Sequence, residues 1–223
     1  MKYIILLLLI FISCDNPRKN YKMNSEKKIS KENVIQNISI LRKCGFFEKF
    51  KKLTDNEVFE KLHTIRIDEY SKIFEKKYDP GMELDEFDLA CLDKTKMIYL
   101  DLECDVGAEN NAYVDVIKMF SNLSNGSFNP RNIKEKWQSP SGPTTIEFEL
   151  DEEIIKFKPE YSEDWLDIKV FEVCHEKIKA QKTRIVECLG ESDYGYGQCI
   201  AFMRLTETEQ KNLENNYKYK FRE

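Results

Sequence analysis

A strict two-residue alternation between residues 96 and 106 constrains the fold more than any other feature of the sequence. One set of alternating positions is apolar and comprises Ile98, Leu100, Leu102, Cys104 and Val106. The other set includes three carboxylates and comprises Met97, Tyr99, Asp101, Glu103 and Asp105. Because successive side chains of a strand point to opposite faces of a sheet, the pattern predicts a β-strand with one buried and one solvent-exposed face.

Residues 145–150 and 153–158 read as the two strands of a hairpin whose register can be predicted. The favoured register pairs Leu150 with Glu153 and thereby opposes Phe148 with Ile155, Ile146 with Phe157, and Glu147 with the oppositely charged Lys156. A shift of one residue would place Phe148 opposite Lys156, so the hydrophobic pattern selects the first register.

Helical patterns and further strands surround these elements. Apolar residues recur at helical spacing in 34–44, 54–77, 110–124 and 162–178, and a capping-box pattern at Thr206 begins a last helix. Ser162 is expected to cap the fourth helix, with Trp165 and Ile168 on its buried side. Two more strands are expected at 184–189 and 198–205. About five strands and these flanking helices predict an α+β fold with a mostly antiparallel sheet, in a single domain over residues 33–223.

The N-terminal residues predict an export signal. Residues 4–12 are apolar without interruption, follow Lys2, and end at Ser13 and Cys14. A membrane-spanning helix needs roughly 20 apolar residues, so this run is too short for a permanent span and is typical of a signal peptide over residues 1–13.

Residues Phe11-Ile12-Ser13-Cys14 resemble the lipobox of bacterial lipoproteins. The resemblance implies cleavage before Cys14, diacylation of its thiol, and anchorage at the cell membrane or outer membrane with the protein outside the cytosol. Two acyl chains on one residue hold a protein stably at a bilayer, whereas one chain binds reversibly. An ordinary signal peptide with a coincidental cysteine is the alternative.

Charge separates a tether from the folded part. Residues 15–32 contain six basic and three acidic side chains and few apolar ones, which predicts a flexible basic tether over residues 14–32. Once Lys2 leaves with the signal peptide, residues 33–223 carry a net charge of −9. A domain with this net negative charge is not expected to bind nucleic acid, because the phosphate backbone is also negatively charged.

The acidity is concentrated between residues 79 and 109, which hold ten acidic and two basic side chains. We expect this segment to bind a basic protein, and the candidate contact residues are Glu83, Asp85, Glu86, Asp88, Asp101, Glu103 and Asp105. The favoured function is a non-enzymatic protein-binding module, of the immunity type or another envelope interaction protein. The Asp-x-Glu-x-Asp order is not an EF-hand, because Val106 and Ala112 replace the required glycine and glutamate.

The carboxylates of Asp101, Glu103 and Asp105 are also compatible with two other functions. A metal-assisted envelope hydrolase would use Asp101, Glu103 and Asp105 as ligands or bases. A plain envelope spacer would carry the same carboxylates only as a solvated strand face. No cofactor and no dedicated metal site is predicted.

The few histidines and the spacing of the cysteines limit which catalytic sites, metal sites and disulfides the chain can form. Only His63 and His175 are available to a nucleophile-histidine site, and no catalytic set is predicted around them. No Cys-x-x-Cys pair occurs, which argues against a zinc finger or a thioredoxin-like site. If the strands at 184–189 and 198–205 pair, Cys188 and Cys199 are a candidate disulfide, with buried free thiols as the alternative.

Overall fold

The computed structural model describes residues 29–74 and 78–222. Cys14, the predicted signal peptide and most of the predicted tether lie outside these residues. Contacts between residues divide the chain into two compact units, with the boundary between Leu92 and Asp93, where the sequence analysis predicts one domain. The division arises because the first helices bury their apolar faces among themselves, while the strands share a separate core with later helices.

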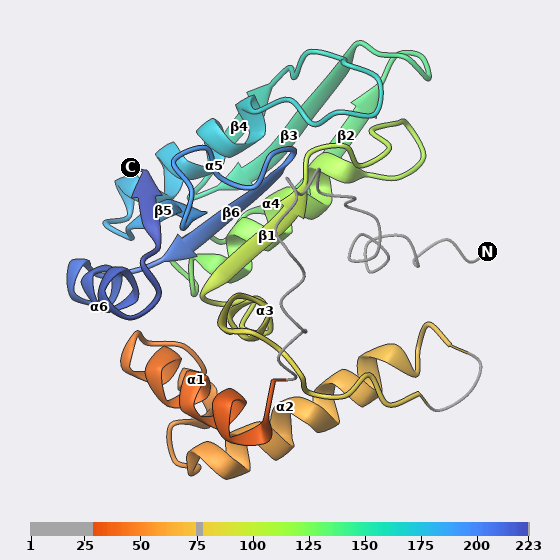
Figure 1. The fold of residues 1–223 in the computed structure, drawn as a ribbon. Helices are drawn as coiled ribbons and strands as arrows, with labels where there is room; N and C mark the ends of the chain where they lie inside the picture. The colour runs from red at the N-terminus through yellow and green to blue at the C-terminus, as the bar shows by residue number, and fades with distance from the viewer. Residues whose placement is uncertain (1–28, 75–77, 223) are drawn as a thin grey trace. The chain divides into compact units, whose positions relative to one another are not determined.

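The first unit is built from helices (Figure 1). They are α1 (Lys31–Lys43), the 3-10 helix η2 (Glu48–Phe50), α2 (Asp55–Tyr70) and α3 (Glu86–Cys91). The apolar stripes of α1 and α2 form much of its core, through Val34, Ile38, Leu41, Val58 and Leu62, each no more than 1% exposed.

Local capping explains where these helices begin. Ser30 accepts a hydrogen bond from the Asn33 N–H, so α1 begins at Lys31 and the predicted tether extends two residues too far. The predicted capping box of Thr54 and Glu57 is confirmed at the start of α2. Helix α2 ends at Tyr70, which is earlier than the predicted end at residue 77.

Two antiparallel sheets and three helices make up the second unit, so the predicted α+β class is confirmed (Figure 1). One sheet has the order β1 (Met97–Asp101), β6 (Cys199–Arg204), β5 (Ile185–Gly190) and β7 (Lys220–Arg222). The other has the order β2 (Arg131–Trp137), β3 (Thr144–Leu150) and β4 (Glu153–Phe157). The helices are α4 (Ala112–Leu123), α5 (Lys169–Ala180) and α6 (Glu207–Tyr217).

The β3–β4 hairpin has the predicted register. Leu150 pairs with Glu153, Phe148 with Ile155, Ile146 with Phe157, and Glu147 with Lys156. Phe148 and Ile146 are completely buried, so the hydrophobic faces of the two strands determine the pairing.

One hydrophobic core joins both sheets to α4 and α5. Helix α4 contacts β1 of one sheet and β2 of the other. At its centre Phe120 of α4, Phe171 of α5 and Phe202 of β6 meet with ring centroids 5.3 to 6.1 Å apart. These ring contacts join α4, α5 and β6 within the core.

Strand β1 differs from its prediction at its end and on its second face. It stops at Asp101, and Asp105 adopts a left-handed conformation with φ 51°. Met97 is completely buried and Asp101 is 7% exposed, so both faces of the strand are covered and the predicted solvent-exposed face is wrong.

The predicted Cys188–Cys199 disulfide is absent, and neither cysteine forms a disulfide bond. Glu187 of β5 pairs with Phe202 of β6, which puts Cys188 and Cys199 two residues out of register. The direct partner of Cys188 is Phe221 of β7, and burial raises the pKa of the Cys188 thiol to about 11.

Candidate functional site

The seven acidic candidate residues belong to two different units. Glu83, Asp85, Glu86 and Asp88 lie before the boundary, and Asp85 is engaged as the N-cap of α3, where its side chain accepts from the Asp88 N–H at 2.8 Å. Asp101, Glu103 and Asp105 lie in the second unit.

Asp101 is a structural carboxylate. The side-chain amide of Gln198 donates to both of its oxygens, at 3.0 and 2.9 Å, and the Glu103 N–H donates at 2.9 Å. With 7% of its surface exposed, Asp101 fixes the end of β1 and is not presented to a partner. Glu103 and Asp105, by contrast, are exposed.

A second acidic segment, residues 160–168, lies directly beside Glu103. The Cys104 N–H donates to the Asp164 carbonyl at 2.8 Å, and the Leu166 N–H donates to the Leu102 carbonyl at 2.8 Å. Glu103 and Trp165 are paired in an isolated antiparallel bridge. We call residues 160–168 the contact segment.

The contact segment is not the first turn of a helix, as the sequence analysis predicts. Its Leu166 N–H and Asp164 carbonyl form hydrogen bonds with residues 102 and 104, Glu163 has φ 53°, and α5 begins only at Lys169. Trp165 and Ile168 are therefore not buried on a helix face but are 40% and 58% exposed, and Tyr161 is 39% exposed.

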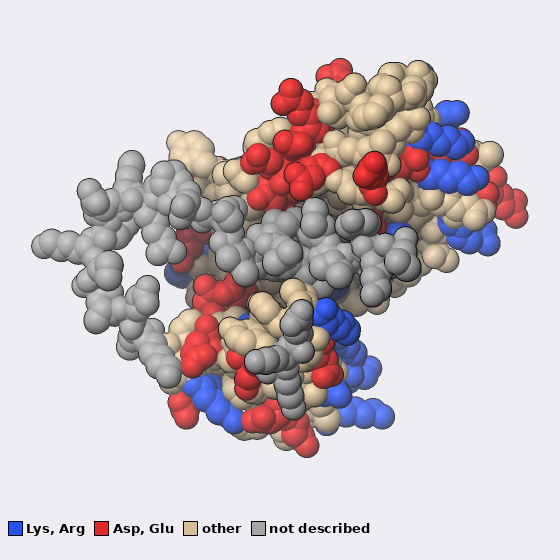
Figure 2. Space-filling view, turned by 90° about the vertical axis from the view of Figure 1, so that its right-hand side faces the viewer, with Lys and Arg blue, Asp and Glu red and all other residues tan. Residues whose placement is uncertain are grey.

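Negative charge surrounds these exposed apolar side chains. Residues 101–109 and 160–168 together contain no Lys or Arg and eight acidic side chains, namely Asp101, Glu103, Asp105, Glu109, Glu160, Glu163, Asp164 and Asp167. Burial raises the pKa of the nearby Cys104 thiol to about 12, and the charges of Asp101 and Asp105 act in the same direction. In the view of Figure 2, many Asp and Glu side chains likewise gather without Lys or Arg among them.

Hydrogen bonds hold the contact segment in shape. The Asp167 carboxylate accepts from the Glu160 N–H at one end and from the Lys169 N–H, at 2.9 Å, at the other. The Asp167 N–H is in turn 3.2 Å from the Tyr113 hydroxyl of α4. A segment closed in this way loses little conformational entropy when a partner binds.

Glu135 of β2 supports the same region, and the sequence analysis misses it. Its Oε2 accepts from the Tyr113 and Val114 N–H groups at 3.1 and 3.3 Å, in place of the side-chain cap that Asn111 does not provide for α4. Its Oε1 accepts from the Trp137 indole at 2.9 Å. Burial raises the pKa of Glu135 above its ordinary value.

Trp137 connects Glu135 to the contact segment. Its ring meets that of Tyr161 edge to face, with centroids 5.8 Å apart and an interplanar angle of 87°. Glu135 therefore positions the start of α4 and, through Trp137, one end of the contact segment. The alternating Lys-Glu-Lys pattern of residues 134–136 is the signal that could have identified this edge strand.

The carboxylates of the hydrolase alternative are not arranged as a metal site. Both carboxylate oxygens of Asp101 accept hydrogen bonds from the Gln198 amide, and Asp105 lies beyond the end of β1. Within residues 29–74 and 78–222, no three His, Cys, Asp or Glu side chains are placed to hold a metal ion. His63 and His175 lie in different units, and His63 is 2.6 Å from the Asp79 carboxylate.

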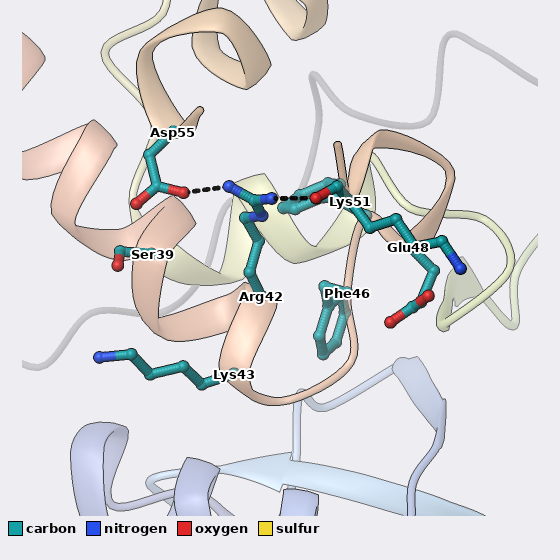
Figure 3. A pocket seen from close by; sticks show the side chains of 8 residues that line it. Ser39, Arg42, Lys43, Phe46, Glu48, Lys51 and Asp55 are labelled. Carbon is teal, nitrogen blue, oxygen red and sulfur yellow. Dashed lines mark hydrogen bonds and ion pairs between the residues drawn. The ribbon is translucent and has the colours of Figure 1, made fainter. Parts of the chain in front are cut away.

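A cavity of about 320 Å³ in the first unit has a structural arginine at its centre (Figure 3). Arg42 reaches from α1 to the Asp55 carboxylate at the start of α2, and it donates to the Lys51 carbonyl at 3.3 Å. The guanidinium thus connects α1, the turn after η2 and the first turn of α2. Lys43 also lines the cavity, but its side chain points away from the Arg42 guanidinium.

We expect Arg42→Ala to destabilise the first unit by about 2 kcal/mol, because it removes hydrogen bonds from a charged donor and leaves Asp55 unpaired. Amide hydrogen exchange in α1 and α2 measures the change locally. Lys43→Ala, the adjacent substitution in the same cavity wall, is the control and should leave exchange unchanged. Equal protection in the Arg42 variant and the wild type would contradict this structural role.

No helix among the described residues is both long and apolar enough to cross a bilayer. The chain matches no family model, and neither the curated proteins nor the solved structures contain a match to it.

Proposed function

We propose that this chain is a lipid-anchored, extracytoplasmic and non-enzymatic module that binds a basic protein through the contact segment. The anchor rests on the apolar run of residues 4–12 and the lipobox-like residues that end at Cys14. The tether of basic residues that follows suits the anionic surface of a membrane.

The observation that carries the binding function is the exposure of Trp165 and Ile168 in a surface segment that holds four carboxylates, with Lys169 as the nearest cation along the chain. The structure has seven exposed large hydrophobic side chains among its described residues, and three of them lie between residues 161 and 168. Exposed aromatic side chains enclosed by polar ones are typical of the energetic centre of protein interfaces.

The chemistry of the proposed partner is inferred from the charges and the apolar side chains of this surface. It carries Lys or Arg side chains that face Glu103, Asp105, Glu163 and Asp164, and an apolar recess that receives the Trp165 indole. The charges speed association and reject acidic proteins, whereas the indole supplies most of the affinity.

Site-specific photo-crosslinking from membranes tests this function. A benzophenone amino acid replaces Ile168 in the full-length chain, and the matched control replaces Ile154, an exposed isoleucine of β4 two residues before Lys156. We expect a discrete adduct with one basic protein from position 168 and none from position 154. The same adducts from both positions, or none from position 168, would contradict the proposal.

The same crosslinking in the Cys14→Ser background tests the anchor. We expect the adduct to leave the membrane fraction, because the acyl chains are no longer attached. A Cys14→Ser chain that stays at the membrane to the same extent as the wild type would exclude lipid anchorage but not the contact with the partner.

A further inference from the structure

A polar cleft of about 390 Å³ lies in the second unit, in a part of it that the contact segment does not include. It is formed where α4 ends, where the chain passes from α5 to β5, and where β6 passes to α6. The lining residues are Ser124, Asn125, Ser127, Lys182, Thr183, Arg184, Arg204, Leu205, Thr206 and Glu209.

The lining is positively charged although the domain as a whole is acidic. Lys182, Arg184 and Arg204 contribute three positive charges, and Glu209 is the one carboxylate in the lining. Glu209 is already paired, since its Oε2 lies 3.1 Å from the ammonium of Lys96, whose side chain is 3% exposed. The negative charge of Glu209 is therefore compensated by a buried lysine.

Neutral carbonyl oxygens, including the side-chain oxygen of Gln210, accept hydrogen bonds from the two arginines. Arg204 donates from Nε to the Leu123 carbonyl at 2.9 Å and from Nη2 to the Thr95 carbonyl at 3.1 Å. Arg184 donates from Nη1 to the Leu205 carbonyl at 3.2 Å. These bonds fix the guanidinium groups in place, and because the acceptors of Arg204 are neutral, its charge remains next to the cleft.

Donors remain for a ligand. Among the residues that the structure describes, neither the Lys182 ammonium nor Nη1 of Arg204 has a hydrogen-bond partner. Hydroxyl groups line the wall between them, and the Thr183 hydroxyl donates to that of Ser127 at 2.8 Å. Guanidinium groups, an ammonium and neutral hydroxyls are the donors that recognise the oxygens of a phosphate group.

We propose that this cleft binds a small phosphate monoester, with Arg204 and Lys182 as the direct contacts to the phosphate oxygens. The volume lies within the range of sites for one small molecule. The phosphate is either that of a soluble ester or that of phosphatidic acid, a phospholipid whose headgroup is itself a phosphate monoester. The inference is independent of the proposed protein-binding function, because the two use different residues.

Calorimetric titration of the full-length chain in detergent tests the proposal, with glycerol 3-phosphate as the soluble probe and glycerol as the uncharged one. We expect saturable binding of the phosphate ester alone. Lys182→Gln should weaken it about tenfold, the value of one charge-assisted hydrogen bond. Lys179→Gln, the same change at an exposed position of α5 outside the cleft, should bind as the wild type does.

Vesicles distinguish the two sources of phosphate. If the ligand is a headgroup, the chain should bind vesicles that contain phosphatidic acid through Lys182, and glycerol 3-phosphate should compete only weakly. If it is a soluble ester, glycerol 3-phosphate should bind equally well with and without vesicles. The proposal would be overturned if neither glycerol 3-phosphate nor vesicles with phosphatidic acid bind saturably. Equal weakening of binding by Lys182→Gln and Lys179→Gln would also overturn it.

Discussion

Trp165→Ala is expected to weaken binding of the protein that crosslinks at position 168 by about 2 kcal/mol, roughly a thirtyfold rise in Kd. The indole is 40% exposed before binding and lies next to Glu103, so a partner that covers it removes a large apolar surface from water. Isothermal titration of the purified partner against wild type and variant measures the effect. Most of the loss should be in the dissociation rate.

Two companion variants separate the apolar contribution from the electrostatic one. Ile154→Ala removes an exposed apolar side chain of β4 and should leave the affinity unchanged. The double variant Glu103→Gln, Asp164→Asn should slow association and reduce its dependence on salt concentration, because it removes two exposed charges. An affinity of Trp165→Ala equal to that of Ile154→Ala would show that the indole is not part of the interface.

Glu135→Ala is expected to destabilise the second unit by about 3 kcal/mol, since it leaves two α4 N–H groups and the Trp137 indole without their acceptor. Hydrogen exchange should accelerate first in the opening turn of α4. Binding of the partner should also weaken, because Trp137 then no longer holds Tyr161 at the end of the contact segment. Glu153→Ala, at an exposed position of β4, is the control.

The effect of Glu135→Ala should depend on pH in a defined direction. Burial raises the pKa of Glu135 in the folded protein above its ordinary value of 4.5, so the folded state binds this proton more tightly than the unfolded chain does. Its ionisation therefore lowers the stability of the wild type as the pH rises through the interval between the unfolded and folded pKa values. The stability difference between wild type and variant should be larger below pH 4.5 than at neutral pH, and the reverse order would contradict a raised pKa.

Elements whose pattern is local could be predicted from the sequence. The capping boxes at Thr54 and Thr206 and the β3–β4 register follow from residues only a few positions apart. Strand β2 was missed because its residues 131–137 are mostly charged and have one apolar face, which is typical of an edge strand. The predicted helix at Ser162 failed because pairing with residues 102–104 satisfies the backbone of that segment instead.

The sequence by itself determined the α+β class, the predominance of acidic side chains, and the apolar run that ends at Cys14, because composition and short-range periodicity are properties of neighbouring residues. Only the tertiary structure decided which carboxylates are available. It buried Asp101 against Gln198 and brought residues 160–168 beside Glu103 with Trp165 exposed. Hydrogen bonds between residues about 60 to 100 positions apart produce this arrangement, and no local pattern encodes such pairings.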